Sequence, residues 1–417
     1  MKIKNEDQFL TDLQKLLQIK TVSGDAGAVT AEAPLGENIK TALDYMLALG
    51  QKEGFISKNL DGYCGYIEMG QGQEMIAILT HLDTVSVGDG WTVPPFDLTI
   101  IEDEAYGRGL LDDKGLAMVS LYAMKALKDQ NLNRRIRLIL GGDEESGEWQ
   151  CMERYKKTEE SPLYSFSPDS GFPAIFAEKG IMNVVFSRKT DDSDGLFTLS
   201  GGNQINAVPD YAKACSEDRC YEIKGKAAHA SEPQKGVNAI IKLAQVLTGQ
   251  GIINPMLDLL NMANKDGFNI DLSDEVSQLT MVPSIAQADE KEMILKCDIR
   301  YPVTMDSSAV LERIKAAVND PQWLIEMTHD VKPLYVDQDG YLIKTLQGVY
   351  QELTGDFSDP VVSGGGTYAR AFKNAVAFGG VFPGEENTCH QKDEHWALDS
   401  MRKNYEIMIG ALSKLAQ

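Results

Sequence analysis

Two short aliphatic runs with a helical segment between them constrain the fold of this chain most. The runs Met75 to Thr80 and Ile136 to Leu140 have the length and character of buried strands, and apolar residues recur at helical spacing from Gly115 to Leu127. A strand, a helix and a second strand in succession indicate an open α/β sheet. We therefore predict a central, mostly parallel sheet flanked by helices.

The pattern along the whole chain indicates two domains, one that contains the predicted central sheet and one inserted into it. Apolar residues repeat at helical spacing over 9–17 and 39–49. From about Gly180 the pattern changes to short alternating segments near 196–200 and 222–224, helical runs over 237–247 and 310–318, and an alternating strand over 293–301. After Lys332 the chain rejoins the first domain through Tyr341 to Leu353. We predict a discontinuous first domain of residues 1–179 and 333–417 and an inserted, smaller α+β domain of residues 180–332.

Charge and composition narrow the partners. The 417 residues carry 40 Lys and Arg against 62 Asp and Glu, a formal net charge of -22, which disfavours nucleic acid and anionic membrane surfaces. No segment approaches the roughly 20 apolar residues of a membrane helix, and the first residues lack the apolar core of a signal peptide. We expect a cytoplasmic protein, monomeric or homodimeric, that acts on small peptides or amino-acid derivatives.

Six cysteines are scattered along the chain without a C-x-x-C pair or a regular framework. We therefore expect all of them to be reduced. They are Cys64, Cys151, Cys215, Cys220, Cys297 and Cys389.

A histidine and an aspartate follow the first aliphatic run directly. His81 and Asp83 stand two residues apart in His81-Leu82-Asp83-Thr84. A metal-bound imidazole commonly donates its other N–H to a carboxylate, so Asp83 can orient His81 as a metal ligand. The same pair also fits a structural or surface role.

Two acidic clusters follow. Asp112-Asp113 lies between a glycine-rich turn and the helical segment, where it is either an acidic helix start or a carboxylate shared by two cations roughly 3.5 to 4 Å apart. Asp143-Glu144-Glu145 leaves the second aliphatic run. Because neighbours on an extended chain point in opposite directions, one glutamate can bind metal while the other serves as a general base. A solvated acidic turn is the alternative.

Asp169 and His390 are ordinary loop residues when taken singly. Together with the histidine and acidic residues described above, they complete two sets of oxygen and nitrogen ligands around a shared aspartate. Such a mixture suits zinc and tolerates manganese or cobalt. The set contains no cysteine thiolate, which disfavours a structural zinc site.

Two further segments have the composition of substrate contacts. His229 lies among small residues that would let a substrate approach, and Gly364-Gly365-Gly366 offers unobstructed backbone N–H groups, with Arg370 one helical turn further on. A surface histidine and a tight loop are the alternatives. His329 and His395 have no such surroundings, and we expect structural roles for both.

The order of these candidate ligand residues along the chain resembles that of the M20 family of metallopeptidases, and the resemblance covers nearly the whole chain. It is strongest to the PepV-like dipeptidase branch of the family. Four strings carry the resemblance: Gly107 to Gly115, Asn206-Ala207-Val208-Pro209, Ile299-Arg300-Tyr301-Pro302 and Gly364 to Arg370. The resemblance implies that the inserted domain is a ferredoxin-like lid. The segment from Lys179 to Lys332 is short for a lid of this branch.

The resemblance also implies a role for each of these residues. His81, Asp112 and Asp169 would hold one divalent ion, and Asp112, Glu145 and His390 the other, with Asp112 bridging and a cis peptide between Asp112 and Asp113. Glu144 would be the general base, Asp83 would orient His81, and His229 would stabilise the oxyanion. The implied substrate-binding residues are Asn206, Arg300, Gly365, Gly366 and Arg370.

The implied reaction is hydrolysis of the peptide bond of dipeptides or very short peptides with a free amino end. A metal-bridging hydroxide would attack the carbonyl while Glu144 moves the proton. Two alternatives stay open at this point: an M20-type amidohydrolase that removes the acyl group from N-acyl amino acids, and a non-catalytic binding protein that keeps the fold. The presence of Glu144 disfavours the second.

Overall fold

A computed structural model describes residues 2–191, 194, 198–216, 219–264, 268, 270 and 272–417. These residues form two compact units. The first unit comprises Met1–Phe176, Val336–Val361 and Thr367–Gln417, and the second comprises Ala177–Tyr335 and Val362–Gly366.

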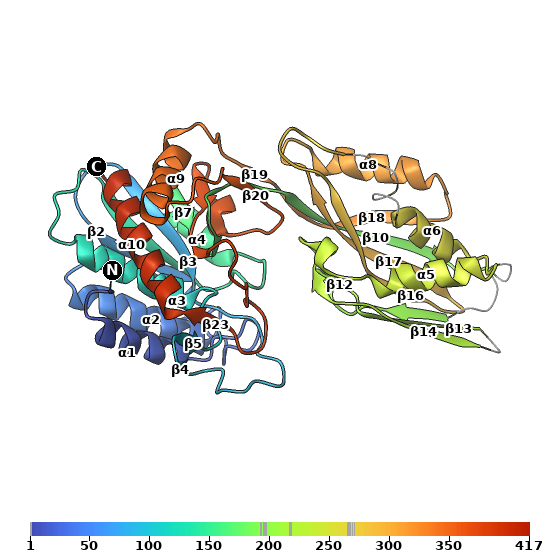
Figure 1. Ribbon diagram of the computed structural model, residues 1–417, viewed down its shortest axis with the longest axis horizontal. Coiled ribbons are helices and arrows are strands. Elements are labelled where there is room, and N and C mark those ends of the chain that lie inside the picture. The colour runs from blue at the N-terminus through green and yellow to red at the C-terminus, as the bar shows by residue number, and fades with distance from the viewer. Residues whose placement is uncertain are drawn as a thin grey trace. The chain divides into compact units, whose positions relative to one another are not determined.

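Most strands of a nine-stranded mixed sheet form the centre of the first unit (Figure 1). Its middle strands β6 (Arg135–Gly141), β3 (Met75–His81), β7 (Tyr164–Ser167) and β21 (Ala375–Ala377) lie side by side and run parallel. On one side of these strands, β2 (Cys64–Met69) pairs antiparallel with β6 and with β1 (Ile56–Leu60). On the other side, β9 (Ile175–Glu178) pairs antiparallel with β21 and with β19 (Leu334–Tyr335). β20 (Val361–Ser363) also pairs with β9. The predicted α/β class is confirmed, and the parallel part is confined to the middle strands.

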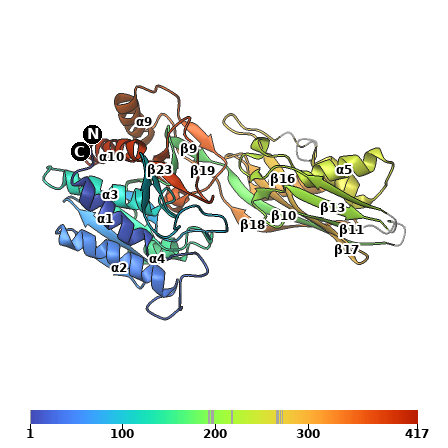
Figure 2. The same ribbon diagram turned by 60° about the horizontal axis from the view of Figure 1, so that its bottom comes forward.

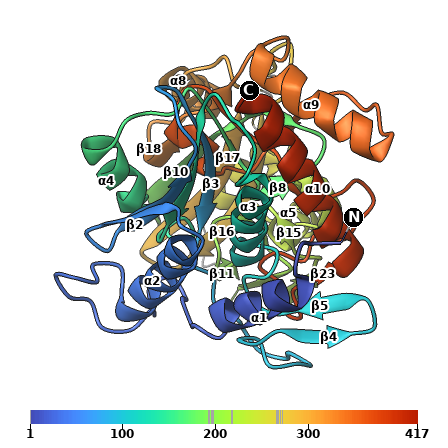
Figure 3. The same ribbon diagram turned by 90° about the vertical axis from the view of Figure 1, so that its left-hand side faces the viewer.

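Helices cover this sheet. α3 (Lys114–Leu127) packs on β3 and β6, and α10 (Leu398–Leu415) packs on α3 and on α9 (Tyr341–Thr354) (Figure 3). α3 is buried along almost its whole length because α1 (Glu6–Leu17) also packs against it. α2 (Glu37–Lys52) packs on β1 and β2, and α4 (Gln150–Thr158) on β2.

Short elements complete the first unit and lie close to the acidic motifs. β4 (Thr99–Ile101), β5 (Glu104–Tyr106) and β23 (His395–Ala397) form a three-stranded sheet. β8 (Ser170–Gly171) pairs with β22 (Gly380–Val381). The 3-10 helix η3 (Tyr368–Ala371) contacts β21, β7 and β3.

An antiparallel sheet of seven strands forms the second unit within the described residues (Figures 1 and 2). Helices α5 (Ala239–Gly249), α6 (Pro255–Ala263) and α8 (Ser307–Val318) share one apolar core with it. The predicted alternation in β17 is confirmed, because Leu295, Cys297 and Ile299 belong to this core. The strands, in spatial order, are β14 (Cys220–Lys224), β13 (Tyr211–Cys215), β11 (Thr198–Gly201), β16 (Thr280–Ala288), β17 (Glu292–Tyr301), β10 (Gly180–Lys189) and β18 (Leu324–Val331).

A small two-stranded sheet also belongs to the second unit. β12 (Ala207–Val208) pairs with β15 (Ala228–His229), and η2 (Pro233–Lys235) follows β15. The alternating segment predicted near 222–224 is part of β14. Residues 196 and 197 of the segment predicted near 196–200 lie outside the described residues, and β11 contains the remainder.

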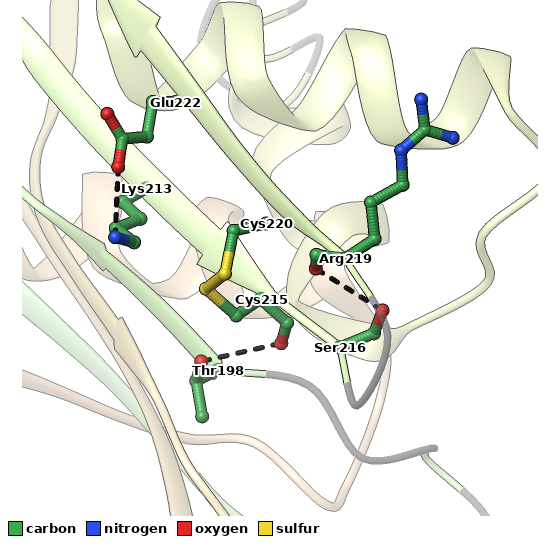
Figure 4. Close-up of a disulfide and its surroundings, with 7 residues drawn as sticks. All are labelled: Thr198, Lys213, Cys215, Ser216, Arg219, Cys220 and Glu222. Atoms are coloured by element: carbon green, nitrogen blue, oxygen red, sulfur yellow. Dashed lines mark hydrogen bonds and ion pairs between the residues drawn. A yellow bond between two sulfur atoms is a disulfide. The ribbon is translucent and has the colours of Figure 1, made fainter.

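A disulfide joins Cys215 and Cys220, so the expectation that all six cysteines are reduced is wrong for this pair (Figure 4). The two residues face each other in the register of β13 and β14, and Lys213 and Glu222 form an ion pair further along the same hairpin. Strand pairing therefore brings the two sulfur atoms together. A spacing of five residues in the sequence does not by itself predict this contact. Cys64, Cys151, Cys297 and Cys389 are free thiols.

No helix within the described residues is both long enough and apolar enough to cross a membrane.

Candidate metal centre

The carboxyl ends of three neighbouring parallel strands carry most of the predicted ligands. His81 is the last residue of β3, Glu144 and Glu145 follow β6, and Asp169 follows β7. β3 lies between β6 and β7, so these segments end at the same edge of the sheet. Open α/β sheets bind their ligands at this edge.

The first ligand group consists of His81, Asp112 and Asp169. His81 Nε2 lies 3.0 Å from Asp112 Oδ1 and 3.6 Å from Asp169 Oδ2. The ligand atoms of the three residues are all within 4.8 Å of one another, which is close enough for one ion to contact all three.

The second ligand group consists of Asp112, Glu145 and His390. His390 Nε2 lies 2.9 Å from Asp112 Oδ2 and 3.2 Å from Glu145 Oε2. Asp112 thus belongs to both groups and uses a different oxygen in each. The structure brings together all five side chains that the sequence predicted as metal ligands.

The start of α3 sets the direction of Asp112. The Asp112–Asp113 peptide bond is cis, as the resemblance implied. Asp113 stands at the N-cap of α3, and its Oδ2 accepts a hydrogen bond from the backbone N–H of His81 at 3.0 Å. This hydrogen bond joins the backbone of His81 to Asp113, the residue that follows Asp112.

Asp83 contacts two of the ligand segments. The Nδ1 atom of His81 lies 3.0 Å from the carbonyl oxygen of Asp83 and 3.4 Å from its Oδ1. The carboxylate of Asp83 also accepts the backbone N–H groups of Glu144 and Glu145, at 3.1 and 3.0 Å. The same carboxylate therefore lies behind the His81 ring and holds the turn that carries the two glutamates.

The acidic run after β6 divides into different environments. Asp143 is buried and accepts the backbone N–H groups of Gln150 and Cys151, where α4 begins, so it serves the fold. Glu145 joins the second ligand group, whereas Glu144 belongs to neither group. The three residues lie beyond the end of β6, in a turn closed by the hydrogen bond from the N–H of Gly147 to the carbonyl oxygen of Glu144, so the turn and not strand alternation separates their side chains.

The charges of the site act strongly on one another. Burial alone would lower the pKa of the His81 imidazole, but hydrogen bonds to Asp112, Asp169 and Asp83 raise it well above its usual range. Burial is likewise outweighed at His390, where Asp112 and Glu145 raise the pKa to about 11. Burial raises the pKa of Glu145 to about 7, with a contribution from the charge of Asp112. The site therefore needs positive charge, which protons supply when no metal ion does.

The residues present fit divalent cations. The Oε1 atom of Glu145 is buried and has no hydrogen-bond partner within the described residues, as is expected of an oxygen that awaits a cation. Two imidazoles and three carboxylates form a donor set suited to zinc, manganese or cobalt.

Four of the predicted substrate residues lie near one another in the second unit. Asn206 precedes β12, and its carbonyl oxygen accepts the N–H of Ala230, next to His229. Nδ1 of His229 lies 2.6 Å from Ser231 Oγ, and a Cβ added at Gly364 would lie 3.0 Å from Ser231 Cβ. Gly365 and Gly366 directly follow Gly364 in the same unit.

Arg300 is held within the second unit by three hydrogen bonds. Its Nε and Nη2 donate to the two oxygens of Asp298 at 2.6 and 2.9 Å, and its Nη1 donates to the carbonyl oxygen of Gly364 at 2.8 Å. Arg300 is only 4% exposed and supports the glycine loop. Arg370 lies in η3 of the first unit.

Sequence reasoning missed three buried residues around the centre. Arg108 and Glu394 form an ion pair beside Asp112, and the ring of Tyr368 packs edge-on at 6.2 Å from that of His81. Glu394 follows His390 by four residues and Arg108 precedes Asp112 by four, so their proximity to ligands in the sequence was the available signal.

Comparison with known proteins agrees with this geometry. The model of peptidase family M20/M25/M40 matches residues 77–414, and the chain belongs to this family. "Putative dipeptidase YtjP" of Bacillus subtilis (strain 168) is 36% identical over 461 residues, covering 100% of this chain and 98% of that protein. A "Putative dipeptidase" of Staphylococcus epidermidis is 34% identical over 463 residues, covering 99% and 98% of the two chains. The family and these relatives identify a hydrolase that cleaves peptides with the help of metal ions.

Solved structures confirm the fold. Aminoacylhistidine dipeptidase from Vibrio alginolyticus superposes with a TM-score of 0.65 at 16% identity, covering 100% of this chain and 97% of that one. Human carnosine dipeptidase 1 superposes with a TM-score of 0.63 at 16% identity, covering 99% and 96%. The predicted combination of an α/β catalytic domain with a smaller lid domain is confirmed.

Proposed function

We propose that this protein is a dinuclear metallo-dipeptidase that hydrolyses dipeptides or very short peptides with a free amino end. One observation carries the proposal: Asp112 directs Oδ1 to His81 and Oδ2 to His390, so one carboxylate serves both ligand groups. The names of the relatives from Bacillus subtilis and Staphylococcus epidermidis support the choice of a dipeptide.

His81, Asp112 and Asp169 would hold one ion, and Asp112, Glu145 and His390 the other, with zinc as the first candidate and manganese or cobalt as alternatives. When bound, such ions polarise a carbonyl oxygen and lower the pKa of a water molecule. Asp83 keeps Nε2 of His81 directed at the ligand group by contacting Nδ1 on the other side of the ring.

Glu144 is the proton carrier of the proposed reaction. Burial raises the pKa of its carboxyl well above the usual range, and the charges of Asp169 and Glu145 raise it further. A carboxyl with a raised pKa can accept a proton from the attacking water and deliver it to the leaving amine. His229 is proposed to donate to the oxyanion, and Asn206, Arg300, Gly365, Gly366 and Arg370 to bind the substrate.

Metal removal and readdition tests the proposal. Dialysis against a chelator should abolish hydrolysis of an unblocked dipeptide, and zinc, manganese or cobalt should restore it. The N-acetyl derivative of the same amino acid, assayed in parallel, separates a dipeptidase from a deacylase. Equal turnover before and after chelation would refute the metal requirement, and a preference for the N-acetyl compound would assign the deacylase activity instead.

The cytoplasmic location and the oligomeric state stay predictions. A cytoplasmic location would be expected to keep cysteines reduced, and the disulfide between Cys215 and Cys220 departs from that expectation.

A further inference from the structure

A buried ion pair lies behind the candidate metal centre and is not part of either ligand group. Arg108 is 1% exposed and Glu394 is fully buried, and Arg108 Nη1 donates to Glu394 Oε2 at 2.7 Å. Pairing of β5 with β23 brings them together, since Arg108 lies just after β5 and Glu394 just before β23. The backbone N–H of Gly107 also donates to the carbonyl oxygen of Glu394.

The carboxylate of Glu394 organises the loop that ends in Asp112. Its Oε2 accepts the N–H of Gly109 at 3.0 Å in addition to Arg108. Its Oε1 accepts the N–H groups of Leu111 at 2.7 Å and of Asp112 at 3.2 Å. Glu394 therefore receives four N–H donors on two oxygens, and one of them belongs to the residue shared by both ligand groups.

The guanidinium of Arg108 reaches two other ligand segments. Its Nη2 donates to the carbonyl oxygen of Gln391, the residue after His390, at 3.1 Å. The same nitrogen donates to the carbonyl oxygen of Ser86, on the segment that begins with His81 and Asp83, at 3.2 Å. The ring of Trp91 lies 5.3 Å from the guanidinium carbon.

We propose that Arg108 and Glu394 are positioning residues that set the separation of the ligands in the two metal groups. The inference rests on the proposed dinuclear function. The pair joins the segments that carry His81, Asp112 and His390, which are distant from one another in the sequence. The group of Asp112, Glu145 and His390 depends on the pair through two of its ligands, and the group of His81, Asp112 and Asp169 depends on it through Asp112 and through the segment after His81.

The chemistry of the contacts requires a carboxylate at position 394. Every group directed at its two oxygens is an N–H donor. The substitution Glu394→Gln places an NH2 group against two of these donors whichever way the amide is turned, so no orientation satisfies the loop. The loop must then move, and Asp112 moves with it.

The test measures metal binding in the absence of turnover. Zinc affinities of both sites are determined by competition with a chromophoric chelator, and the visible absorption of the cobalt-loaded protein reports on ligand geometry. The matched control is Glu68→Gln, because Glu68 is also a buried glutamate of the first unit and pairs with an arginine, Arg137, across β2 and β6.

Glu394→Gln is expected to weaken zinc binding roughly 10- to 100-fold, most at the site that contains His390, and to change the cobalt spectrum. Glu68→Gln is expected to bind both ions as the unaltered protein does. Unchanged affinities and spectrum in Glu394→Gln, or an equal loss in Glu68→Gln, would overturn the positioning role.

A second variant covers the case in which Glu394→Gln does not fold. Arg108→Lys keeps the positive charge beside Glu394, but a single ammonium cannot occupy the positions of both Nη1 and Nη2. It should therefore lose a smaller part of the zinc affinity, and an unchanged affinity would overturn the proposal. Failure of the proposed function is separate and visible in the unaltered protein, which would then bind fewer than two ions.

Discussion

At the scale of single residues, the polar side chains of the site each contact two partners through two different atoms. Asp112 contacts His81 with one oxygen and His390 with the other. His81 directs Nε2 to the ligand group and Nδ1 to Asp83, whose carboxylate also holds the backbone of Glu144 and Glu145. Removing one such side chain therefore disturbs more than one contact, whereas Glu144 lies outside this ligand network.

The variant Glu144→Ala should keep its metal ions and lose turnover. Because Glu144 belongs to neither ligand group, its removal takes away the proposed proton carrier and leaves the ligands in place. We expect kcat to fall by about 10²- to 10⁴-fold, measured with an unblocked dipeptide next to metal analysis of the same sample. Glu148→Ala, an exposed glutamate of the same segment, is the control. Turnover near that of the control would rule out the assigned role.

At the scale of elements, the start of α3 decides where Asp112 lies. Gly115 is the second residue of this helix, and a Cβ built on it would lie 1.9 Å from the carbonyl oxygen of Leu110. Only glycine allows the helix to approach the preceding loop this closely. The position of α3 on β3 and β6 then determines the distance between Asp112 and the strand ends.

The substitution Gly115→Ala should destabilise the protein by about 1 to 3 kcal/mol, because the added methyl group forces the helix away from Leu110. Gly348 in α9 is the matched control, since a Cβ there would have no neighbour within 4 Å. Gly348→Ala should stabilise the helix by about 0.5 to 1 kcal/mol, because alanine loses less backbone entropy on folding. Urea unfolding followed by circular dichroism measures both, and a gain of stability in both variants would contradict the close approach.

At the scale of the whole molecule, metal binding and folding are coupled through protons. In the metal-free protein, the pKa of His390 is raised from 6.5 to about 11 and that of Glu145 from 4.5 to about 7. The folded state binds both protons more tightly than the unfolded chain does. Their contribution to stability is therefore complete at low pH and is lost as the pH rises through these folded-state values.

Added zinc should accordingly raise the Tm more at about pH 8 than at about pH 6. The metal-free protein loses stability as the pH rises over this range, while the bound ions take the place of the protons. Scanning calorimetry with and without zinc at each pH measures the difference. An equal increase at both values would show that the ions do not replace protons at these residues.

Several parts of the fold could be predicted from local pattern alone. The aliphatic runs became β3 and β6, and the helical periodicity between them became α3 (Lys114–Leu127). The alternation of Leu295, Cys297 and Ile299 places them in the core of the second unit. Periodicity succeeds in these cases because burial of one face is a property of neighbouring residues.

The sequence by itself determined the kind of chemistry, because His81, Asp112, Glu145, Asp169 and His390 are side chains that bind divalent cations and stand at the ends of predicted strands or in turns. Only the tertiary structure decided which atoms meet. The parallel order of β6, β3 and β7 gathers the ligand segments, and the pairing of β5 with β23 sets Arg108 against Glu394. The bond between Cys215 and Cys220 likewise depends on the register of two strands. These contacts join residues whose separation along the chain carries no information about distance, so strand order and register had to be known first.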